Sequence, residues 1–355
     1  MKKNILVTGG CGFIGSNLVH YLLRKYPEYK IVNYDKLTYA GNPNNLKDIE
    51  NLENYVFIKG DICDDKKLKE TFEKYEITDV IHLAAESHVD RSILDPYVFE
   101  WTNVHGTHCL LNVAMNYWEK KFGTLKGHRF HHVSTDEVYG SLELDSKEKF
   151  TENTKYDPHS PYSASKASSD HFVKAFHDTY GMNTTISNCS NNYGPYQYPE
   201  KLIPVVLFNL MSEKPIPVYG KGENIRDWLY VEDHCSAIDF IFHNGVAGET
   251  YNVGGNHEMS NIDMINTIIE IFAHQRQLND NKKYIVNPEP MWIKKYKSLI
   301  TYVEDRKGHD LRYAIDCSKL ESMGWKQKVT FEEGIRKTIN FYCDNFDSGW
   351  IKDIE

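Results

Sequence analysis

The amino-acid sequence predicts an α/β fold with a doubly wound parallel sheet and a smaller, discontinuous α/β domain. Short apolar runs alternate with segments of helical period through the first half of the chain. A glycine-rich turn follows the first of these runs, and the composition shifts towards Pro and Tyr after "NNYGPYQYP" at 191–199. Strands that are separated by helices pair in parallel through crossover connections, so the first half predicts a parallel sheet.

Six apolar runs are expected to form the strands of this sheet. Between the strands, large apolar residues recur at helical spacing over 102–122 and over 162–180, which predicts two amphipathic helices. The predicted strands are residues 4–9, 30–35, 55–61, 79–85, 129–134 and 184–190.

A chain of 355 residues is long enough for about two domains. We expect the first to cover residues 1–190 with a return segment at about 227–257, and the second to cover 191–226 and 258–355. In the return segment, "RDWLYVEDHCSAIDFIF" at 226–242 is predicted to be a helix. "ETYNVGG" at 249–255 is predicted to be a strand that rejoins the first sheet.

Charge and cysteine usage exclude several classes of partner. The 50 Asp and Glu residues against 41 Lys and Arg give a formal net charge of -9, so no basic surface is available for nucleic acid or an anionic membrane. The 7 cysteines form no C-x-x-C pair and no metal-ligand spacing, which is typical of a reducing compartment. No apolar run approaches the roughly 18 residues of a membrane span. We therefore expect a cytoplasmic protein without a membrane anchor.

The sequence "GGCGFIG" at 9–15 follows the first predicted strand and precedes a helical segment. Gly9, Gly12 and Gly15 can form a tight turn that lets the backbone approach a pyrophosphate, and the amino end of the helix attracts that group. A plain strand-to-helix turn is the alternative. The context on both sides favours a dinucleotide site and therefore a sheet of the Rossmann type.

Residues at the ends of the next strands fit the same cofactor. Asp35 can accept hydrogen bonds from an adenosine ribose and would repel a 2′-phosphate, which favours NAD over NADP, although Lys36 beside it weakens that preference. Asp61 is placed to meet the adenine, or it caps the following helix. The small residues Ala84 and Ala85 let the backbone approach the cofactor.

Tyr162 and Lys166 lie four residues apart on one predicted helix and therefore share a face. A phenol is a poor base at neutral pH, but a neighbouring ammonium and a nicotinamide cation both favour its anion. The pair can then take a proton from a sugar hydroxyl while hydride leaves the same carbon. A solvent-facing helix pair is the alternative.

The stretch "STDEVYG" at 134–140 places two carboxylates directly after a predicted buried strand. A surface turn is the simple interpretation. The functional one is a general acid and a general base whose environments separate their pKa values. The residues alone indicate the pair, Asp136 and Glu137, but not which of them is the acid.

Four histidines, His82, His88, His131 and His132, are interpreted as structural. Strand alternation points the last two to opposite faces, and no carboxylate or thiol has ligand-like spacing to either. We therefore expect no metal site and an activity that is insensitive to chelators.

The motifs together resemble the extended short-chain dehydrogenase/reductase family, most closely its dTDP-glucose 4,6-dehydratases. The resemblance spans nearly the whole chain and includes "LVTGGCGFIGSN", "HLAAESHVDRS", "STDEVYG", "PYSASKASSDH", "NCSNNYGPYQYPEKLIP" and "DRKGHDLRYAID". It implies tightly bound NAD and a nucleoside-diphosphate sugar as substrate. It also implies a homodimer formed through helices at 101–122 and 162–180.

The resemblance further implies roles for individual residues, with Lys307 standing where relatives often carry Pro. The implied catalytic residues are Thr135, Asp136 as the acid for O6, Glu137 as the base at C5, Tyr162 and Lys166. The implied cofactor residues are Gly9, Gly12, Phe13, Ile14, Gly15, Asp35, Lys36, Leu37, Thr38, Asp61, Ile62, Leu83, Ala84, Ala85, Thr102, Tyr162, Lys166 and Asn192. The implied substrate residues are Ser87, Ser134, Thr135, Asn191, Lys201, Leu202, Pro217, Val218, Tyr219, Arg226, Asn261, Asp305, Arg306 and His309.

The implied reaction oxidises C4 of the sugar, eliminates water across C5 and C6, and returns the hydride to C6. UDP-glucose in place of dTDP-glucose stays open, because the two nucleotides differ only by a methyl group and a ribose hydroxyl. Sugar-nucleotide epimerases and decarboxylases share the fold, and GDP-mannose dehydratases are nearer relatives, but the carboxylate pair argues against all three. A non-catalytic NAD-binding scaffold is disfavoured because Tyr162, Lys166 and the carboxylates occur together.

Overall fold

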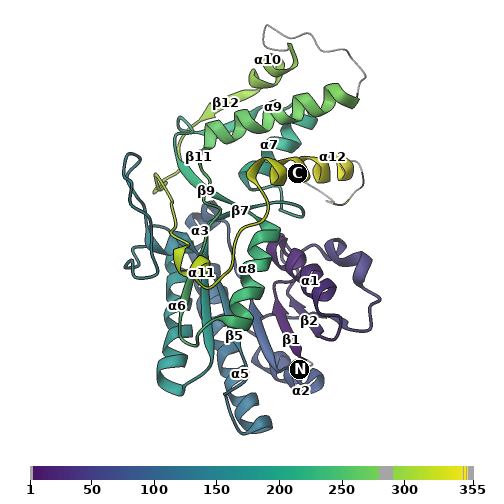
Figure 1. Cartoon of the computed structure of the whole chain (residues 1–355), viewed down its shortest axis with the longest axis vertical. Helices are drawn as coiled ribbons and strands as arrows, with labels where there is room; N and C mark the ends of the chain where they lie inside the picture. Colours follow the sequence, from purple (N-terminus) through teal and green to yellow (C-terminus); the bar gives the residue numbers. More distant parts are fainter. Residues whose placement is uncertain (1–2, 280–290, 347, 349, 351–355) are drawn as a thin grey trace.

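The structure is a computed structural model that describes residues 3–279, 291–346, 348 and 350. Its main sheet has seven parallel strands in the order β10-β6-β5-β4-β1-β2-β3 (Figure 1). The six strands predicted for the first half are confirmed within a few residues, and the predicted returning strand pairs with β6. The strands are β1 (Asn4–Thr8), β2 (Lys30–Asp35), β3 (Tyr55–Lys59), β4 (Asp79–His82), β5 (Phe130–Thr135), β6 (Thr184–Cys189) and β10 (Thr250–Val253).

Helices cover both faces of this sheet, which confirms the predicted doubly wound α/β class. On one face, Leu18, Leu22 and Phe242 pack with strand residues in a buried core. On the other face, Phe72 and Trp118 belong to a second core. The first face is covered by α1 (Phe13–Lys25) and α8 (Val231–Asn244), and the second by α2 (Asp65–Tyr75), α5 (Thr107–Phe122) and α6 (Pro161–Tyr180).

Local sequence fixes where α6 begins, and this start positions two of the predicted catalytic residues. Ser160 and Ser163 form a reciprocal capping box, and Pro161 occupies the first helical position. The helix ends at Gly181 with a φ of 69°. Tyr162 consequently lies in the first turn and Lys166 one turn later.

Short helical segments occupy the loops near the carboxyl edge of the sheet. The predicted helix at 102–122 is confirmed from Thr107 onwards, while the preceding residues form a π-helical turn. These segments are η1 (Pro43–Ile49), α3 (Val89–Leu94), α4 (Pro96–Phe99), η2 (Glu100–Gly106) and η3 (Asp136–Tyr139).

The rest of the chain builds two small sheets, ordered β11-β9-β7 and β12-β8, and a group of helices around a third core. Residues 226–230 belong to strand β9, so the helix predicted from residue 226 is wrong there and begins only at Val231. The strands are β7 (Asn191–Tyr193), β8 (Ile216–Tyr219), β9 (Ile225–Tyr230), β11 (Glu258–Ser260) and β12 (Ile300–Val303). The helices are α7 (Leu202–Met211), α9 (Asn261–Asn279), α10 (Met291–Lys297), α11 (Ser318–Ser322) and α12 (Phe331–Asn345).

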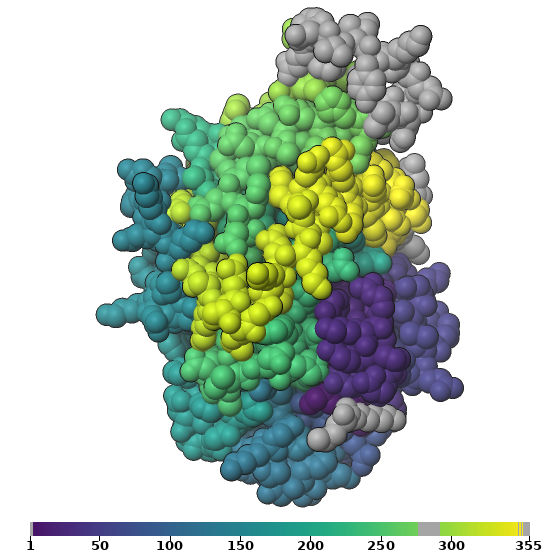
Figure 2. Space-filling view, in the orientation of Figure 1, coloured from purple at the N-terminus to yellow at the C-terminus, as the bar shows by residue number. Residues whose placement is uncertain are grey.

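The C-terminal segment from α11 to α12 connects the main sheet with the helices of the third core. Leu320 and Trp325 pack with Leu229 and Tyr251, and Figure 2 shows this yellow segment running over the green residues beside the main sheet. The predicted division into two domains stays a prediction, supported by the separate third core. Within the described residues, no helix is long and apolar enough to cross a membrane.

Candidate active site

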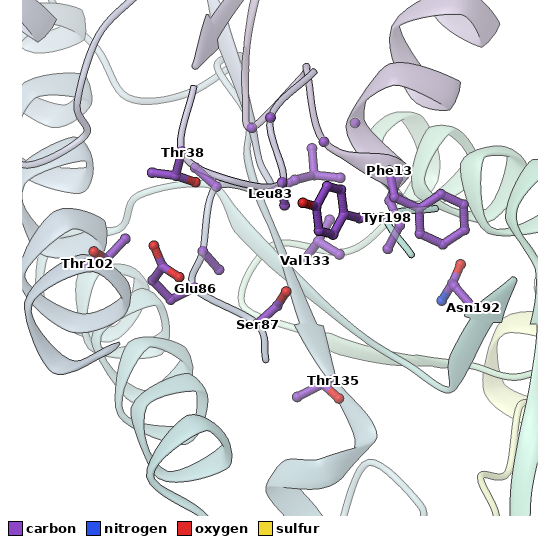
Figure 3. A pocket seen from close by; sticks show the side chains of 18 of the residues that line it. Phe13, Thr38, Leu83, Glu86, Ser87, Thr102, Val133, Thr135, Asn192 and Tyr198 are labelled. Atoms are coloured by element: carbon purple, nitrogen blue, oxygen red, sulfur yellow. The ribbon is translucent and has the colours of Figure 1, made fainter. Parts of the chain in front are cut away.

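A cavity of about 300 Å³ opens at the carboxyl ends of the central strands. The strand order reverses at this point, because β2 and β3 follow β1 on one side while β4, β5 and β6 follow on the other. Open α/β sheets bind ligands at such a switch point. The turn after β1, the ends of β2 to β6 and the loop at 189–201 contribute side chains to the cavity wall (Figure 3).

The glycine turn has the geometry of a dinucleotide cradle. Gly9 has a φ of +71°, and a Cβ on it would lie 2.8 Å from the Cα of Ala84. A Cβ on Gly15 would overlap the carbonyl of Gly9. Gly12 caps α1 without any side-chain hydrogen bond, which leaves the first N–H groups of a 13-residue helix beside the cavity. These residues therefore fit a pyrophosphate.

Asp35 and Asp61 lie on the same side of the cavity. The Asp35 carboxylate accepts hydrogen bonds from the N–H groups of Cys11 (2.9 Å) and Leu37 (2.8 Å), which fixes the end of β2 against the glycine turn. The ammonium of Lys36 pairs with Asp61 at 2.8 Å, so its charge is already balanced. Helix α2 is capped by Asp64, so the alternative role of Asp61 as the helix cap is wrong.

Asp136 and Glu137 form the start of η3 directly after β5. Asp136 is 1% exposed and Glu137 is partly buried, so the pair does not form an exposed surface turn. One oxygen of Asp136 lies 3.4 Å from the Thr135 hydroxyl, and the other has no hydrogen-bond partner. Both side chains line the cavity. A buried oxygen that faces a cavity without a protein partner is available to a ligand.

The surroundings act differently on the pKa values of the two carboxyl groups. Burial, and then the charges of Glu137 and Asp227, raise the pKa of Asp136 well above its ordinary value, which favours the protonated form. Burial also raises the pKa of Glu137, but Lys201, Arg226 and Arg306 act against that rise. The electrostatics therefore favour Asp136 as the proton donor and Glu137 as the base.

Tyr162 and Lys166 are both buried at the cavity wall, so the interpretation as a solvent-facing pair is wrong. Tyr162 hydrogen-bonds to Thr135, which lowers its pKa, but burial and the charge of Glu137 raise that pKa well above the ordinary value. The Lys166 ammonium donates to the carbonyl of Val133 at 2.9 Å. Burial and the charge of Glu137 thus oppose the phenolate form of Tyr162.

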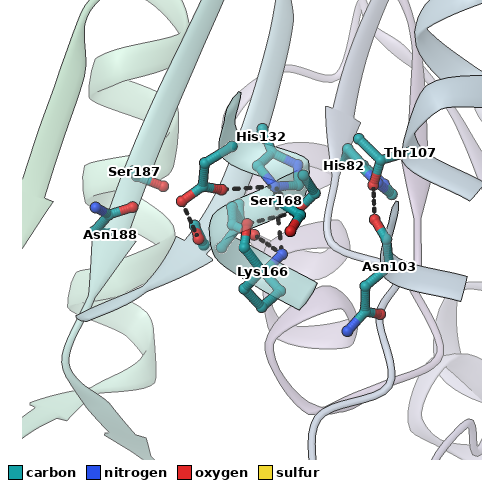
Figure 4. A network of polar contacts seen from close by, with 12 residues as sticks. His82, Asn103, Thr107, His132, Lys166, Ser168, Ser187 and Asn188 are labelled. Carbon is teal, nitrogen blue, oxygen red and sulfur yellow. Dashed lines mark hydrogen bonds and ion pairs between the residues drawn. The ribbon is translucent and has the colours of Figure 1, made fainter. Parts of the chain in front are cut away.

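The buried histidines have partners within the protein. His131 lies 3.0 Å from the Thr185 hydroxyl, on one side of the sheet. On the other side, His132 lies 3.4 Å from the Lys166 ammonium (Figure 4). A carboxylate does approach His132, since Asp170 lies 3.1 Å from its Nε2. The described residues contain no group of three or more metal-ligating side chains.

Most of the residues implied for the cofactor and the chemistry converge on the cavity, while most of those implied for the nucleotide of the substrate do not. The cavity brings together Gly9, Gly12, Phe13, Ile14, Gly15, Asp35, Lys36, Thr38, Asp61, Ile62, Leu83, Ala84, Ala85, Ser87, Thr102, Ser134, Thr135, Asp136, Glu137, Tyr162, Lys166, Asn191, Asn192 and Lys201. Outside its wall lie Leu37, Leu202, Pro217, Val218, Tyr219, Arg226, Asn261, Asp305, Arg306 and His309.

Some of the outlying residues form a second cluster near the end of β8. The guanidinium of Arg306 lies 4.9 Å above the Tyr219 ring, and the His309 ring stands edge-on to it at 6.4 Å. Arg306 also pairs with Asp90 at 3.3 Å. By contrast, the guanidinium of Arg226 is buried and donates to the backbone carbonyls of residues 225, 310 and 311.

The cavity wall also contains residues that the sequence did not single out. The Glu200 carboxylate accepts a hydrogen bond from Tyr39 at 3.1 Å, and Glu86 is buried beside Asn103. The run of Tyr and Glu just before Lys201 was the available signal for Tyr198 and Glu200. The additional wall residues are Tyr34, Ala40, Gly41, Gly60, Glu86, Val133, Cys189, Ser190, Gln197, Tyr198 and Glu200.

Comparisons with known proteins agree with this geometry. Residues 6–338 match the family model described as GDP-mannose 4,6 dehydratase. The chain is 50% identical over 360 residues to dTDP-glucose 4,6-dehydratase 1 of Escherichia coli K12, covering 99% of this chain and 95% of that protein. The dTDP-glucose 4,6-dehydratase of Bacillus anthracis, solved in complex with NAD, is 44% identical with a TM-score of 0.81 and 97% coverage of both chains. The Streptomyces venezuelae enzyme of the same name is 40% identical with a TM-score of 0.85 and 99% coverage of both chains.

Proposed function

Because the chain belongs to the dTDP-glucose 4,6-dehydratase family of extended short-chain dehydrogenases/reductases, we propose that it dehydrates dTDP-glucose to the 4-keto-6-deoxy sugar nucleotide. The observation that carries this proposal is a pair of carboxyl groups, the buried Asp136 and the partly buried Glu137, at the wall of a cavity that Tyr162 also lines. Oxidation of a sugar hydroxyl requires a base such as the tyrosine and a hydride acceptor, but no further acid or base. The two carboxyl groups add the acid and the base that elimination needs.

NAD is the cofactor that the glycine turn and Asp35 fit. When it is bound, NAD accepts hydride from C4 of the sugar and later returns it to C6, so the reaction has no net oxidation. Gly12 and the amino end of α1 hold the pyrophosphate, and Asp35 receives the ribose hydroxyls. The Lys36 charge is neutralised by Asp61, so it adds little free attraction for a 2′-phosphate, which supports the preference for NAD over NADP.

Tyr162 and Thr135 act on the O4 hydroxyl of the sugar. Tyr162 takes the O4 proton while Thr135, already hydrogen-bonded to Tyr162, also binds O4. Burial and the charge of Glu137 oppose the phenolate form of Tyr162, and the positive charge of a bound nicotinamide ring would favour it. Proton removal is thereby coupled to the presence of the cofactor.

Asp136 and Glu137 then remove water across C5 and C6. The C4 ketone makes the C5 proton acidic, and Glu137 takes that proton. The C–O bond at C6 breaks as protonated Asp136 gives its proton to the departing oxygen, which leaves as water. Glu137 returns a proton to C5 when C6 is reduced and is then a carboxylate again. The proton that Tyr162 took from O4 leaves to solvent, and Asp136 takes a proton from solvent, before the next cycle.

We place the nucleotide of the substrate near the cluster of Tyr219, Arg306 and His309. A guanidinium binds a diphosphate in bidentate fashion, and an aromatic ring can stack on a pyrimidine. Arg306 has a buried Nε without a partner, which leaves a donor for a phosphate oxygen. Arg226 is held by backbone carbonyls and contributes its charge rather than a direct contact in this arrangement.

The test is incubation of the purified protein with dTDP-glucose and, separately, UDP-glucose in deuterated water. Dehydration predicts a product that has lost one water and carries deuterium at C5. An epimerase would give a product without loss of water and without deuterium at C5. Conversion of UDP-glucose in preference to dTDP-glucose would contradict the proposal of thymine as the nucleobase of the substrate. Absence of both products would overturn the proposed function.

The protein is further proposed to act in the cytoplasm as a homodimer. No disulfide bond involves Cys11, Cys63, Cys109, Cys189, Cys235 or Cys317, as expected in a reducing compartment. Leu94, Tyr97 and Trp101 are exposed apolar residues on α3, α4 and η2, and Phe172 is exposed on α6. These residues belong to or adjoin the two helical segments that the family uses, and a second chain would cover them.

Substitution of Trp101 by Glu is expected to convert the dimer to a monomer. Trp101 is 44% exposed and stacks on Tyr97 and His105, so a carboxylate there would be buried without a partner in the dimer. Light scattering should give twice 41.3 kDa for the wild type and 41.3 kDa for the variant. Val246, which is 60% exposed after α8, provides the control: Val246→Glu should remain dimeric. A dimeric Trp101→Glu variant would place the interface elsewhere.

A further inference from the structure

A buried polar cluster lies beside Lys166 and reaches the cavity wall through Ser134. Its centre is Asp170, which is 1% exposed and follows Lys166 by one turn of α6. The mechanism proposed above gives this carboxylate no part in the chemistry, and Asp170 does not line the cavity. We call this group the Asp170 cluster; its members are His132, Ser134, Tyr156, Ser169 and Asp170.

One oxygen of Asp170 joins α6 to the catalytic end of β5. It accepts hydrogen bonds from the hydroxyls of Ser134 at 2.8 Å and Tyr156 at 3.1 Å. Ser134 immediately precedes Thr135 in the chain, so this bond holds the strand end that presents Thr135 and the two carboxyl groups. The second oxygen of Asp170 lies 3.1 Å from Nε2 of His132 and has no hydrogen bond of its own.

The charge of Asp170 acts on Lys166. The Lys166 side chain is buried, and its ammonium donates only to neutral groups, the carbonyl of Val133 and the ring of His132 (Figure 4). Burial lowers the pKa of Lys166. The negative charge of Asp170 is the largest influence that opposes this effect, followed by Cys189. A buried ammonium without such a countercharge tends to lose its proton.

We propose that Asp170 is a positioning residue for the dehydration, which acts by keeping Lys166 charged and by fixing Ser134 at the end of β5. The role rests on the proposed function, because Lys166 matters only if the cavity carries out redox chemistry on a sugar. Asp170 itself touches neither the cavity nor the groups that would react. Its effect on the reaction is therefore indirect and should depend on pH.

The direction of that dependence follows from the surroundings. Burial raises the pKa of Asp170 to about 6, while Lys166 and the hydroxyls of Ser134 and Tyr156 act against the rise. Below about pH 6 the carboxylate is protonated and no longer supports the ammonium. The titratable and charged groups that face Asp170 are His132 from β5, Lys166 and His171 from α6, Tyr139 from η3 and Tyr156 from the loop before α6.

The first test is Asp170→Asn, which removes the charge but keeps the shape and an acceptor oxygen for Ser134. The pKa of Lys166 should fall, so the alkaline limb of the kcat/KM–pH profile for dTDP-glucose should move down by about one pH unit or more. The control is Asp178→Asn, an exposed position on the same helix, which should leave the profile unchanged. Circular dichroism and the NAD content of the purified variants establish that the fold is retained.

The second test is Tyr156→Phe, which keeps the charge and removes one hydrogen bond to it. The pKa of Asp170 should rise, so the acid limb should move up while the alkaline limb stays in place. Profiles of both variants that superimpose on the wild type, or a uniform fall in activity at every pH, would overturn the positioning role. Wild-type protein that forms no product from dTDP-glucose would overturn the proposed function and this role with it.

Discussion

Replacement of Tyr162 by Phe is expected to lower kcat by roughly 10²–10⁴-fold, because the O4 proton then has no acceptor in the cavity wall. The ring itself is retained, so packing against Phe99 and the buried start of α6 should survive. Loss of the hydroxyl removes the hydrogen bond to Thr135 but also removes a buried polar atom, so stability should change by about 1 kcal/mol or less. Turnover of dTDP-glucose measured at saturating substrate reports the effect.

Tyr180 provides a matched control, because it lies at the end of the same helix and is 53% exposed. Tyr180→Phe should leave turnover unchanged. In Tyr162→Phe, both product formation and deuterium exchange at C5 should stop together, since the ketone that makes C5 acidic no longer forms. Exchange that continued without product would mean that another group takes the O4 proton.

Much of the fold could be predicted because, in the first half of the chain, the local sequence of each strand reflects its buried position in the sheet. The strands of the main sheet are buried on both faces, so they appear as continuous apolar runs that end at turn residues. The sequence predicts a helix at residues 226–230, which is wrong, because "RDWLY" shows no alternation of polar and apolar residues. These residues form a strand by pairing with β7 and β11, which are distant in sequence. Long-range pairing of this kind leaves no local periodicity.

The same distinction applies to the site. Gly9, Gly12 and Gly15 form a motif because one turn contains the entire cradle. Glu200 at the cavity wall accepts a hydrogen bond from Tyr39, which belongs to a loop far away in sequence, so the sequence does not predict this contact. The sequence also does not predict the charges around Asp136, because Asp227, which raises its pKa, belongs to the distant strand β9. The sequence predicts the carboxylate pair, and the distribution of surrounding charge favours Asp136 as the acid and Glu137 as the base.

That assignment predicts different failures for the two carboxyl groups. Asp136→Asn should lower formation of the keto-deoxy product by roughly 10²–10⁴-fold, because the departing O6 has no proton donor. Glu137 remains able to take the C5 proton once the ketone is present. Recovered dTDP-glucose should therefore still acquire deuterium at C5 in deuterated water, as measured by mass spectrometry.

Glu137→Gln should lose both product formation and C5 exchange, because the base itself is removed. The amide replacements keep the size of each side chain, so the comparison isolates proton transfer from packing. Three cations, Lys201, Arg226 and Arg306, and one carboxylate, Asp310, act on Glu137. Two carboxylates, Glu137 and Asp227, and one cation, Arg226, act on Asp136, so the balance of charge favours protonation of Asp136. If Asp136→Asn abolished exchange while Glu137→Gln retained it, the two roles would have to be reversed. Product formed at the original rate by the double amide variant would remove elimination chemistry from this pair altogether.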